Sequence, residues 1–93
     1  MSDWIKRDRA HVWHPFTQMQ TAPDPLVITQ AKNAVLYTDD DREFIDCNSS
    51  WWVNVHGHGN EHIAQAISAQ VKTLDHVIFA GATHPKAIEL AER

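Results

Sequence analysis

The sequence predicts an α/β chain of the α+β kind, in which short antiparallel strands are combined with helices. Two runs rich in β-branched and aromatic residues, LVITQ (residues 26–30) and AVLYT (34–38), predict neighbouring strands. A helical repeat of apolar residues between Asn60 and Leu74 predicts a long amphipathic helix. With 93 residues, 43% of them apolar, the chain has the size of one small domain and an ordinary globular composition.

The N-terminal segment predicts a short helix that ends before Pro15. Ser2 or Asp3 suits its N-cap, because a short polar side chain can accept a hydrogen bond from an amide of the first turn. The residue before a proline is disfavoured in the helical region, which sets the end. Residues 21–25 (TAPDP) predict a loop, since two prolines interrupt both a helix and a strand ladder.

The middle of the chain predicts an antiparallel meander. DDDRE (39–43) has the composition of a turn, and FIDC (44–47) follows as a third strand that includes Cys47. The next residues are SSWWVNVHGHGNEHI (49–63). In an extended backbone, Trp51 and Trp52 would point to opposite faces.

Two helices complete the prediction. Asn60 is a suitable N-cap, Glu61 and Lys72 match the poles of the helix dipole, and the apolar stripe is expected to pack on neighbouring elements. In the last residues, HPKAIELAER (84–93), Thr83 or His84 can cap a helix whose first turn holds Pro85. This helix has no closing glycine before Arg93, so we expect the chain to be part of a longer protein.

Composition and charge narrow the classes of function. The net charge is −4 with scattered lysines and arginines, so no nucleic-acid partner is expected. No apolar run is long enough to span a bilayer, and the first residues lack the apolar core of a signal peptide. The single cysteine, Cys47, excludes an internal disulfide. We therefore expect a soluble, cytoplasmic chain with no membrane partner.

Three histidines, His56, His58 and His62, raise the question of a metal site. HGHGNE approaches the H-x-H-x-D-H pattern of metallo-β-lactamases, but Asn60 stands where the aspartate is needed and Glu61 where the last histidine is needed. A catalytic zinc needs three good ligands and an open fourth position. A polar turn leading into the helix is the better interpretation, and we expect no metal. A zinc hydrolase is the weakest alternative.

No nucleophile motif is present either, so the sequence predicts no catalytic residue. Ser49 and Ser50 lie outside any G-x-S-x-G elbow, and Cys47 has no organised histidine partner nearby in sequence. The paired tryptophans, Trp51 and Trp52, can be core residues or the wall of a pocket. A flat, rigid wall suits a long aliphatic substrate or a planar cofactor. Phe16, next to the rigid bend at Pro15, could line the same pocket.

Three blocks resemble one family, in the same order: WHPFTQM (13–19), DCNSSWWVNVHGHGNEHI (46–63) and HVIFAGATHPKAIELAE (76–92). The chain is similar to the adenosylmethionine-8-amino-7-oxononanoate aminotransferases of biotin synthesis. These belong to the class-III aminotransferases, which have fold type I and depend on pyridoxal 5′-phosphate (PLP). The resemblance covers almost the whole chain. It implies that residues 1–93 are the N-terminal segment and part of the small domain, with the large PLP-binding domain outside them.

The resemblance also implies roles for particular residues. Trp51 corresponds to a tryptophan that lines the substrate pocket, Phe16 to an aromatic that shapes it, and Trp52 is a further substrate-binding candidate. Many relatives carry tyrosine at the position of Phe16, so the amino donor is left open between S-adenosylmethionine and lysine. The implied partners are small-molecule substrates and a second copy in a homodimer.

In the longer enzymes of this family, three groups lie beyond the stretch that corresponds to residues 1–93. They are the lysine that forms the Schiff base, the acid that holds the pyridinium nitrogen and the glycine-serine turn that binds the phosphate. Lys6, Lys32, Lys72 and Lys86 match none of those motifs, so no cofactor-binding residue is expected in this chain and we expect it to be inactive alone. Two alternatives stay open: another class-III aminotransferase, acting on ω-amino acids, and a small non-catalytic binding module.

Overall fold

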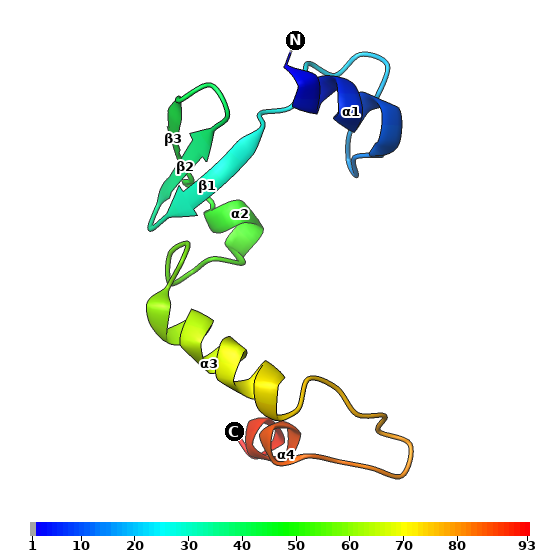
Figure 1. Cartoon of the computed structure of the whole chain (residues 1–93), viewed down its shortest axis with the longest axis vertical. Helices are drawn as coiled ribbons and strands as arrows, with labels where there is room; N and C mark the ends of the chain where they lie inside the picture. Colours follow the sequence, from blue (N-terminus) through cyan, green and yellow to red (C-terminus); the bar gives the residue numbers. More distant parts are fainter. Residues whose placement is uncertain (1) are drawn as a thin grey trace. The chain divides into compact units, whose positions relative to one another are not determined.

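The computed structural model describes residues 2–93, which form two compact units, one ending at Gly59 and one running from Asn60 to Arg93. The elements follow one another along the chain (Figure 1) as α1 (Asp3–His11), β1 (Ile28–Lys32), β2 (Val35–Thr38), β3 (Glu43–Ile45), α2 (Ser49–Trp52), α3 (Glu61–Thr73) and α4 (Pro85–Ala91). Helices with a small antiparallel sheet confirm the predicted α+β class.

Helix α1 has the predicted cap. The hydroxyl of Ser2 accepts a hydrogen bond from the amide of Ile5 at 3.4 Å, and the helix gives way to extended backbone at Val12. The chain after it then folds back, because the ring of His14 bonds both carboxylate oxygens of Asp8, at 2.9 and 3.0 Å. A short connection leads from there into the sheet.

The three strands form the predicted meander, in the order β1-β2-β3 with both pairs antiparallel. Thr38 organises the turn between β2 and β3. It is 4% exposed, and its hydroxyl accepts a hydrogen bond from the Arg42 amide at 3.0 Å. The third strand is shorter than predicted. It ends at Ile45. Cys47 lies in the turn that follows, and its amide donates to the Ile45 carbonyl at 3.1 Å.

The extended backbone predicted for Trp51 and Trp52 is wrong. Ser49, Ser50, Trp51 and Trp52 all have positive φ, between 49° and 66°, so α2 is a single left-handed turn. Its backbone bonds run from the amide of Trp52 to the carbonyl of Asn48 at 2.8 Å and from Val53 to Ser49 at 3.0 Å. Each non-glycine residue in this region costs roughly 1–2 kcal/mol, so the turn stores strain that its surroundings must offset.

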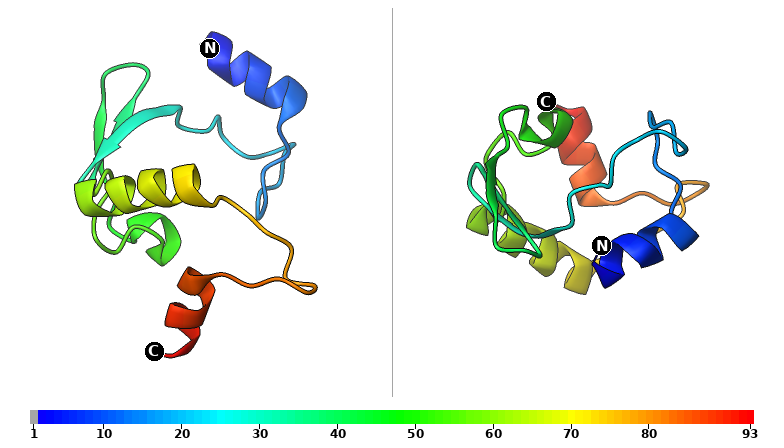
Figure 2. Two further views of the ribbon diagram at one scale, coloured as in Figure 1. Left: turned by 60° about the horizontal axis from the view of Figure 1, so that its bottom comes forward. Right: turned by 90° about the horizontal axis from the view of Figure 1, so that it is seen from above.

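In the second unit, α3 and α4 begin as predicted (Figure 2). The Asn60 side chain accepts from the Ile63 amide at 3.1 Å, and Nδ1 of His84 accepts from the Ala87 amide at 3.3 Å, just before Pro85. The apolar stripe of α3 was expected to be packed. Instead Ile63, Ile67 and Val71 on that stripe are exposed in this structure.

Across residues 2–93, no hydrophobic side chain is fully buried. Many of the large apolar side chains, all four tryptophans among them, are exposed. The interactions that hold the first unit together are therefore mainly the hydrogen bonds of the sheet, of the helix cap and of short polar clusters. None of the helices in the described chain combines the length and the apolar character that crossing a bilayer requires.

Candidate functional site

The first unit brings two of the predicted site residues together. The rings of Phe16 and Trp51 lie with their centroids 5.3 Å apart and their planes tilted by 51°, a favourable geometry for two aromatic rings. We call these two residues the aromatic pair. They are 35 positions apart in the sequence (51 − 16) and come from the loop after α1 and from the left-handed turn α2.

Both members of the aromatic pair have a backbone in the left-handed region. The φ angle is 51° at Phe16 and 62° at Trp51, where a side chain other than glycine is disfavoured. Phe16 is 90% exposed and Trp51 is 58% exposed. The pair therefore offers an accessible aromatic surface whose direction is set by strained backbone.

Trp52, the third predicted residue, follows Trp51 in the same turn and is more exposed than it. Because the turn is left-handed and not extended, successive side chains diverge by a helical step and not by a half-turn. Trp52 makes no ring contact with the aromatic pair among the described residues. The structure brings together Phe16 and Trp51, and leaves Trp52 beside them in sequence only.

A polar cluster holds the left-handed turn, and the sequence analysis missed it. One carboxylate oxygen of Asp46 accepts from the amide of Ser50 at 2.9 Å, and the other accepts from the Ser50 hydroxyl at 2.8 Å. The second oxygen also bonds Nε2 of His58 at 2.6 Å. We call Asp46, Ser50 and His58 the Asp46 cluster. The side chain of Asp46 is 6% exposed and that of His58 is 14% exposed, so this contact is shielded from water.

These hydrogen bonds favour the ionised form of Asp46. Its pKa lies below the usual value of 3.8, first because of the bond from His58 and then because of the two bonds from Ser50. Charge-assisted bonds of this kind are stronger than neutral ones. The carboxylate is thus matched to its donors, and the donors fix the start of the turn that carries Trp51.

His58 is itself held in place by the backbone. It forms an isolated antiparallel bridge with Asn33, with the Asn33 amide bonding the His58 carbonyl at 3.0 Å and the reverse bond at 2.8 Å. Gly57, just before it, has a φ of 83°, and a Cβ there would lie 3.2 Å from the Cα of Asn33. Only glycine meets both demands without strain.

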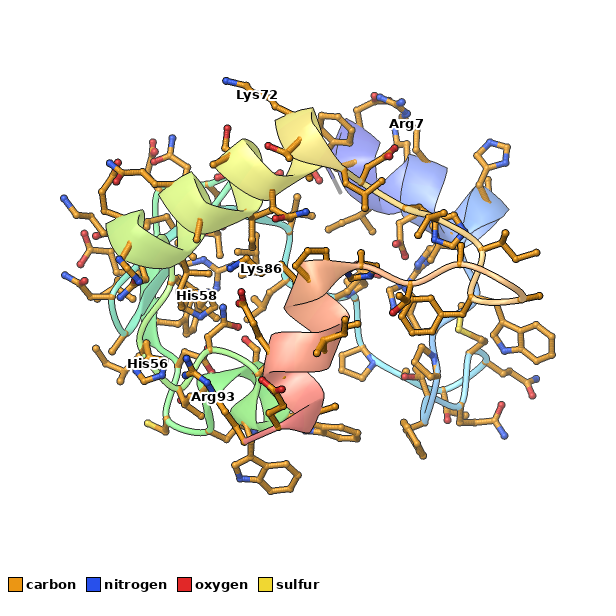
Figure 3. All side chains as sticks on the ribbon, turned by 90° about the horizontal axis from the view of Figure 1, so that it is seen from below. Arg7, His56, His58, Lys72, Lys86 and Arg93 are labelled. Atoms are coloured by element: carbon orange, nitrogen blue, oxygen red, sulfur yellow. The ribbon has the colours of Figure 1, made fainter. Side chains whose placement is uncertain are left out.

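The histidines do not assemble as a metal centre in the described residues, where no group of three or more histidine, cysteine, aspartate or glutamate side chains comes together. His56 and His58 lie on the same loop (Figure 3), and the Nε2 of His58 is engaged by Asp46. His62 lies in the first turn of α3, in the second unit. The interpretation of this region as a turn leading into a helix is the one that its geometry fits.

A cavity of about 530 Å³ lies beside Phe16, between α1 and the loop that follows it. This volume falls in the range of small-molecule sites. Apolar side chains line it, among them Phe16 and Met19, and its rim carries an ion pair between Arg9 and Asp24 and the bond between Asp8 and His14. Phe16 therefore lines a hollow of suitable size for a small molecule, whereas Trp51 is not among the residues that line it.

The four lysines in the described chain, Lys6, Lys32, Lys72 and Lys86, are all exposed. A Schiff-base lysine is activated by a desolvated or positively charged pocket, and all four side chains here are exposed. Figure 3 shows Lys72 pointing away from its helix, and Lys86 pairs with Glu89 at 2.9 Å.

Comparison with known proteins defines the class. Residues 17–93 match the family Aminotransferase class-III, and the chain belongs to this family. The family implies dependence on PLP.

Among curated proteins, the chain is 54% identical over 81 residues to the adenosylmethionine-8-amino-7-oxononanoate aminotransferase of Synechococcus elongatus, covering 87% of this chain and 19% of that protein. It is 37% identical over 95 residues to the protein of the same name from Geobacter sulfurreducens, covering 100% of this chain and 20% of the relative. The chain thus spans about a fifth of the length of the curated relatives it matches.

Solved structures agree in fold. The adenosylmethionine-8-amino-7-oxononanoate aminotransferase of Methanocaldococcus jannaschii matches with a TM-score of 0.88 at 30% identity, over 96% of this chain and 21% of that one. An (S)-enantioselective omega-transaminase from Thermomicrobium roseum matches with a TM-score of 0.86 at 29% identity, over 96% and 21%. The backbone described here is therefore one that PLP-dependent transaminases share.

Proposed function

We propose that residues 1–93 are the N-terminal segment and part of the small domain of a biotin-pathway aminotransferase. The complete enzyme would transfer an amino group from S-adenosylmethionine or lysine to 8-amino-7-oxononanoate and release 7,8-diaminononanoate. The names of several curated relatives support this reaction, and the identity of 54% to one of them favours it over more distant transaminase reactions.

The observation that carries the proposal is the contact between Phe16 and Trp51. Two exposed aromatic rings lie in contact, and one of them, Phe16, also lines a cavity of about 530 Å³; together they form a surface suited to a long aliphatic chain or a flat base. The acceptor, an amino-ketone on an alkyl chain, has such a shape. The role proposed for Phe16 and Trp51 is to bind and orient the substrate and to exclude water from it.

Transamination in this family is the chemistry of PLP, which carries the amino group between donor and acceptor. The proposal assigns the anchoring of PLP to other parts of the enzyme, since the lysines described here are exposed. The 93-residue chain by itself is accordingly proposed not to transaminate. The complete enzyme is proposed to be a cytoplasmic homodimer, as the family resemblance implies.

The amino donor is proposed to depend on the ring at position 16. A phenylalanine keeps the stacking face that an adenine needs and has no hydroxyl to donate a hydrogen bond. Stacking favours S-adenosylmethionine, whereas lysine has no ring to stack. Phe16→Tyr would add the hydroxyl at an accessible position. It would therefore separate the contribution of stacking from that of the hydrogen bond.

A second candidate function has a specific observation behind it. The omega-transaminase from Pseudomonas jessenii matches this chain with a TM-score of 0.89, as high as any biotin-pathway neighbour named above, at 26% identity. Because backbone similarity at this level is shared by both groups, an enzyme acting on ω-amino acids is the main alternative. A non-catalytic binding module is the alternative from another class.

The test is an assay of the protein expressed from its complete open reading frame. It would be incubated with PLP, 8-amino-7-oxononanoate and either S-adenosylmethionine or lysine, with formation of 7,8-diaminononanoate followed by mass spectrometry. A parallel reaction would offer an ω-amino acid as donor and pyruvate as acceptor. Product only in the second reaction would replace the proposal by its alternative, and product in neither would favour the binding module. The 93-residue chain serves as the expected inactive control.

A further inference from the structure

The residue that the observations single out beyond the aromatic pair is Asp46. It lies at the end of the sheet, and its two carboxylate oxygens take three hydrogen bonds from Ser50 and His58. Two of these donors belong to the second residue of the left-handed turn α2, and the third belongs to a loop twelve positions away in sequence. The carboxylate therefore ties two segments to one point.

The turn held by Asp46 cannot be attributed to its own sequence. Four consecutive residues with positive φ and no glycine are disfavoured at every position. A short segment takes such a conformation only when the surrounding structure over-determines it. Asp46 supplies such a constraint through Ser50, and the bridge between Asn33 and His58 holds the histidine that bonds Asp46.

We propose that Asp46 is a positioning residue for substrate binding, acting through Ser50 and the left-handed turn to set the ring of Trp51 against Phe16. Asp46 does not touch the proposed substrate surface. Its effect reaches the substrate through one backbone step, from Ser50 to Trp51. The binding role rests on the proposed function, whereas the orientation of Trp51 can be measured without it.

The first measurement is spectroscopic and needs no activity. In the protein expressed from its complete reading frame, the near-ultraviolet circular dichroism of the parent minus that of Trp51→Ala isolates the signal of the Trp51 indole in its contact with Phe16. The same difference is then taken in an Asp46→Asn background. This substitution keeps the shape of the side chain and removes its charge, and the difference signal should fall to less than about half. Retention of the full signal would overturn the proposal.

The second measurement is a double-mutant cycle on the KM for the acceptor, with kcat recorded alongside. Asp46→Asn should raise KM roughly tenfold in the parent, within the range of coupled neighbours, and should leave kcat nearly unchanged. In the Trp51→Ala background the same substitution should add almost nothing. Effects of Asp46→Asn that simply multiply with those of Trp51→Ala would mean a general structural role, and would refute positioning.

Matched variants make each result decisive. Asp41→Asn makes the same charge change in the turn between β2 and β3 and should leave both the dichroism and KM as in the parent. His58→Gln keeps a donor toward Asp46 and should retain most of the Trp51 signal, whereas His58→Phe should lose it. If Asp46→Asn does not fold, Ser50→Ala removes the single bond of 2.8 Å and is read in the same way, with a smaller loss expected.

The proposed function can fail separately. If the protein does not aminate 8-amino-7-oxononanoate but the Trp51 dichroism depends on Asp46 as described, the reaction is wrong and the positioning of Trp51 stands. If the reaction proceeds and neither the dichroism nor KM responds to Asp46→Asn, the positioning role is wrong and the reaction stands.

Discussion

The substitution Gly57→Ala tests the bridge that holds His58. A Cβ at this position would lie 3.2 Å from the Cα and 3.5 Å from the carbonyl oxygen of Asn33, and both of those atoms are backbone. No flexible side chain can move aside, so the two bridging segments must separate by a few tenths of an ångström. The bonds of 3.0 and 2.8 Å between Asn33 and His58 would then weaken.

The loss of stability expected for Gly57→Ala combines a backbone cost, a partial offset from the unfolded chain and a cost of overpacking. The φ of 83° at Gly57 costs an alanine roughly 1–2 kcal/mol, partly offset by about 0.4–1 kcal/mol from the stiffer unfolded chain. Overpacking against fixed atoms adds about 1–3 kcal/mol. We expect local destabilisation of about 2–3 kcal/mol. Gly59→Ala is the matched control, since its φ is 67° but its nearest atom, the Ala31 carbonyl oxygen, is 3.8 Å away. It should cost about 1 kcal/mol.

The assay is native-state hydrogen exchange at the amides of Asn33 and His58, which report the opening of the bridge itself. Since about 1.4 kcal/mol corresponds to a factor of ten, Gly57→Ala should accelerate exchange at these amides by at least about fivefold more than Gly59→Ala. Equal acceleration by the two variants would refute the reasoning, because it would show that positive φ alone, and not the approach of Asn33, requires glycine at position 57.

Three further predictions concern the aromatic pair, the carboxylate of Asp46 and a helix cap. Phe16→Ala and Trp51→Ala should each raise the KM for the acceptor with little change in kcat, and the double variant should show less than the product of both effects in steady-state kinetics. Because the pKa of Asp46 is lowered in the folded protein, the stabilisation by its ionised form is complete above the usual value of 3.8 and is lost as the pH falls below it. Asp46→Asn should therefore lower the free energy of unfolding at about pH 6 in denaturant unfolding. The difference in unfolding free energy from the parent should narrow toward about pH 3. Asn60→Ala should cost about 1 kcal/mol in α3, seen as faster exchange of the Ile63 amide.

Local signals in the sequence were enough to place most of the regular elements. Ser2 and Asn60 cap the helices they were expected to cap, and Pro85 lies in the first turn of α4. The meander followed from β-branched runs separated by an acidic turn. These features depend on residues within about four positions of each other, which a sequence pattern can represent.

The turn at residues 49–52 could not be predicted in this way. Positive φ is signalled by glycine, and the sequence Ser-Ser-Trp-Trp has none. The turn depends on Asp46 and on His58, which lies beyond the turn in a different loop. The family resemblance nevertheless selected Phe16 and Trp51, whose contact the structure contains, although their functional role is a proposal. Asp46 lies in the block that resembles the family, but no motif assigned it a role.

The strain in this turn bears on the role proposed for the aromatic pair. A left-handed turn of four residues costs several kcal/mol at roughly 1–2 kcal/mol each, and an ordinary right-handed or extended segment would hold two tryptophans at no such cost. The hydrogen bonds that Asp46 makes with Ser50 and His58 offset part of this cost. What the left-handed geometry does supply is a fixed direction for Trp51 against Phe16, whose own backbone is also left-handed. Strain at two aromatic residues that touch each other supports the proposal that Phe16 and Trp51 bind the substrate.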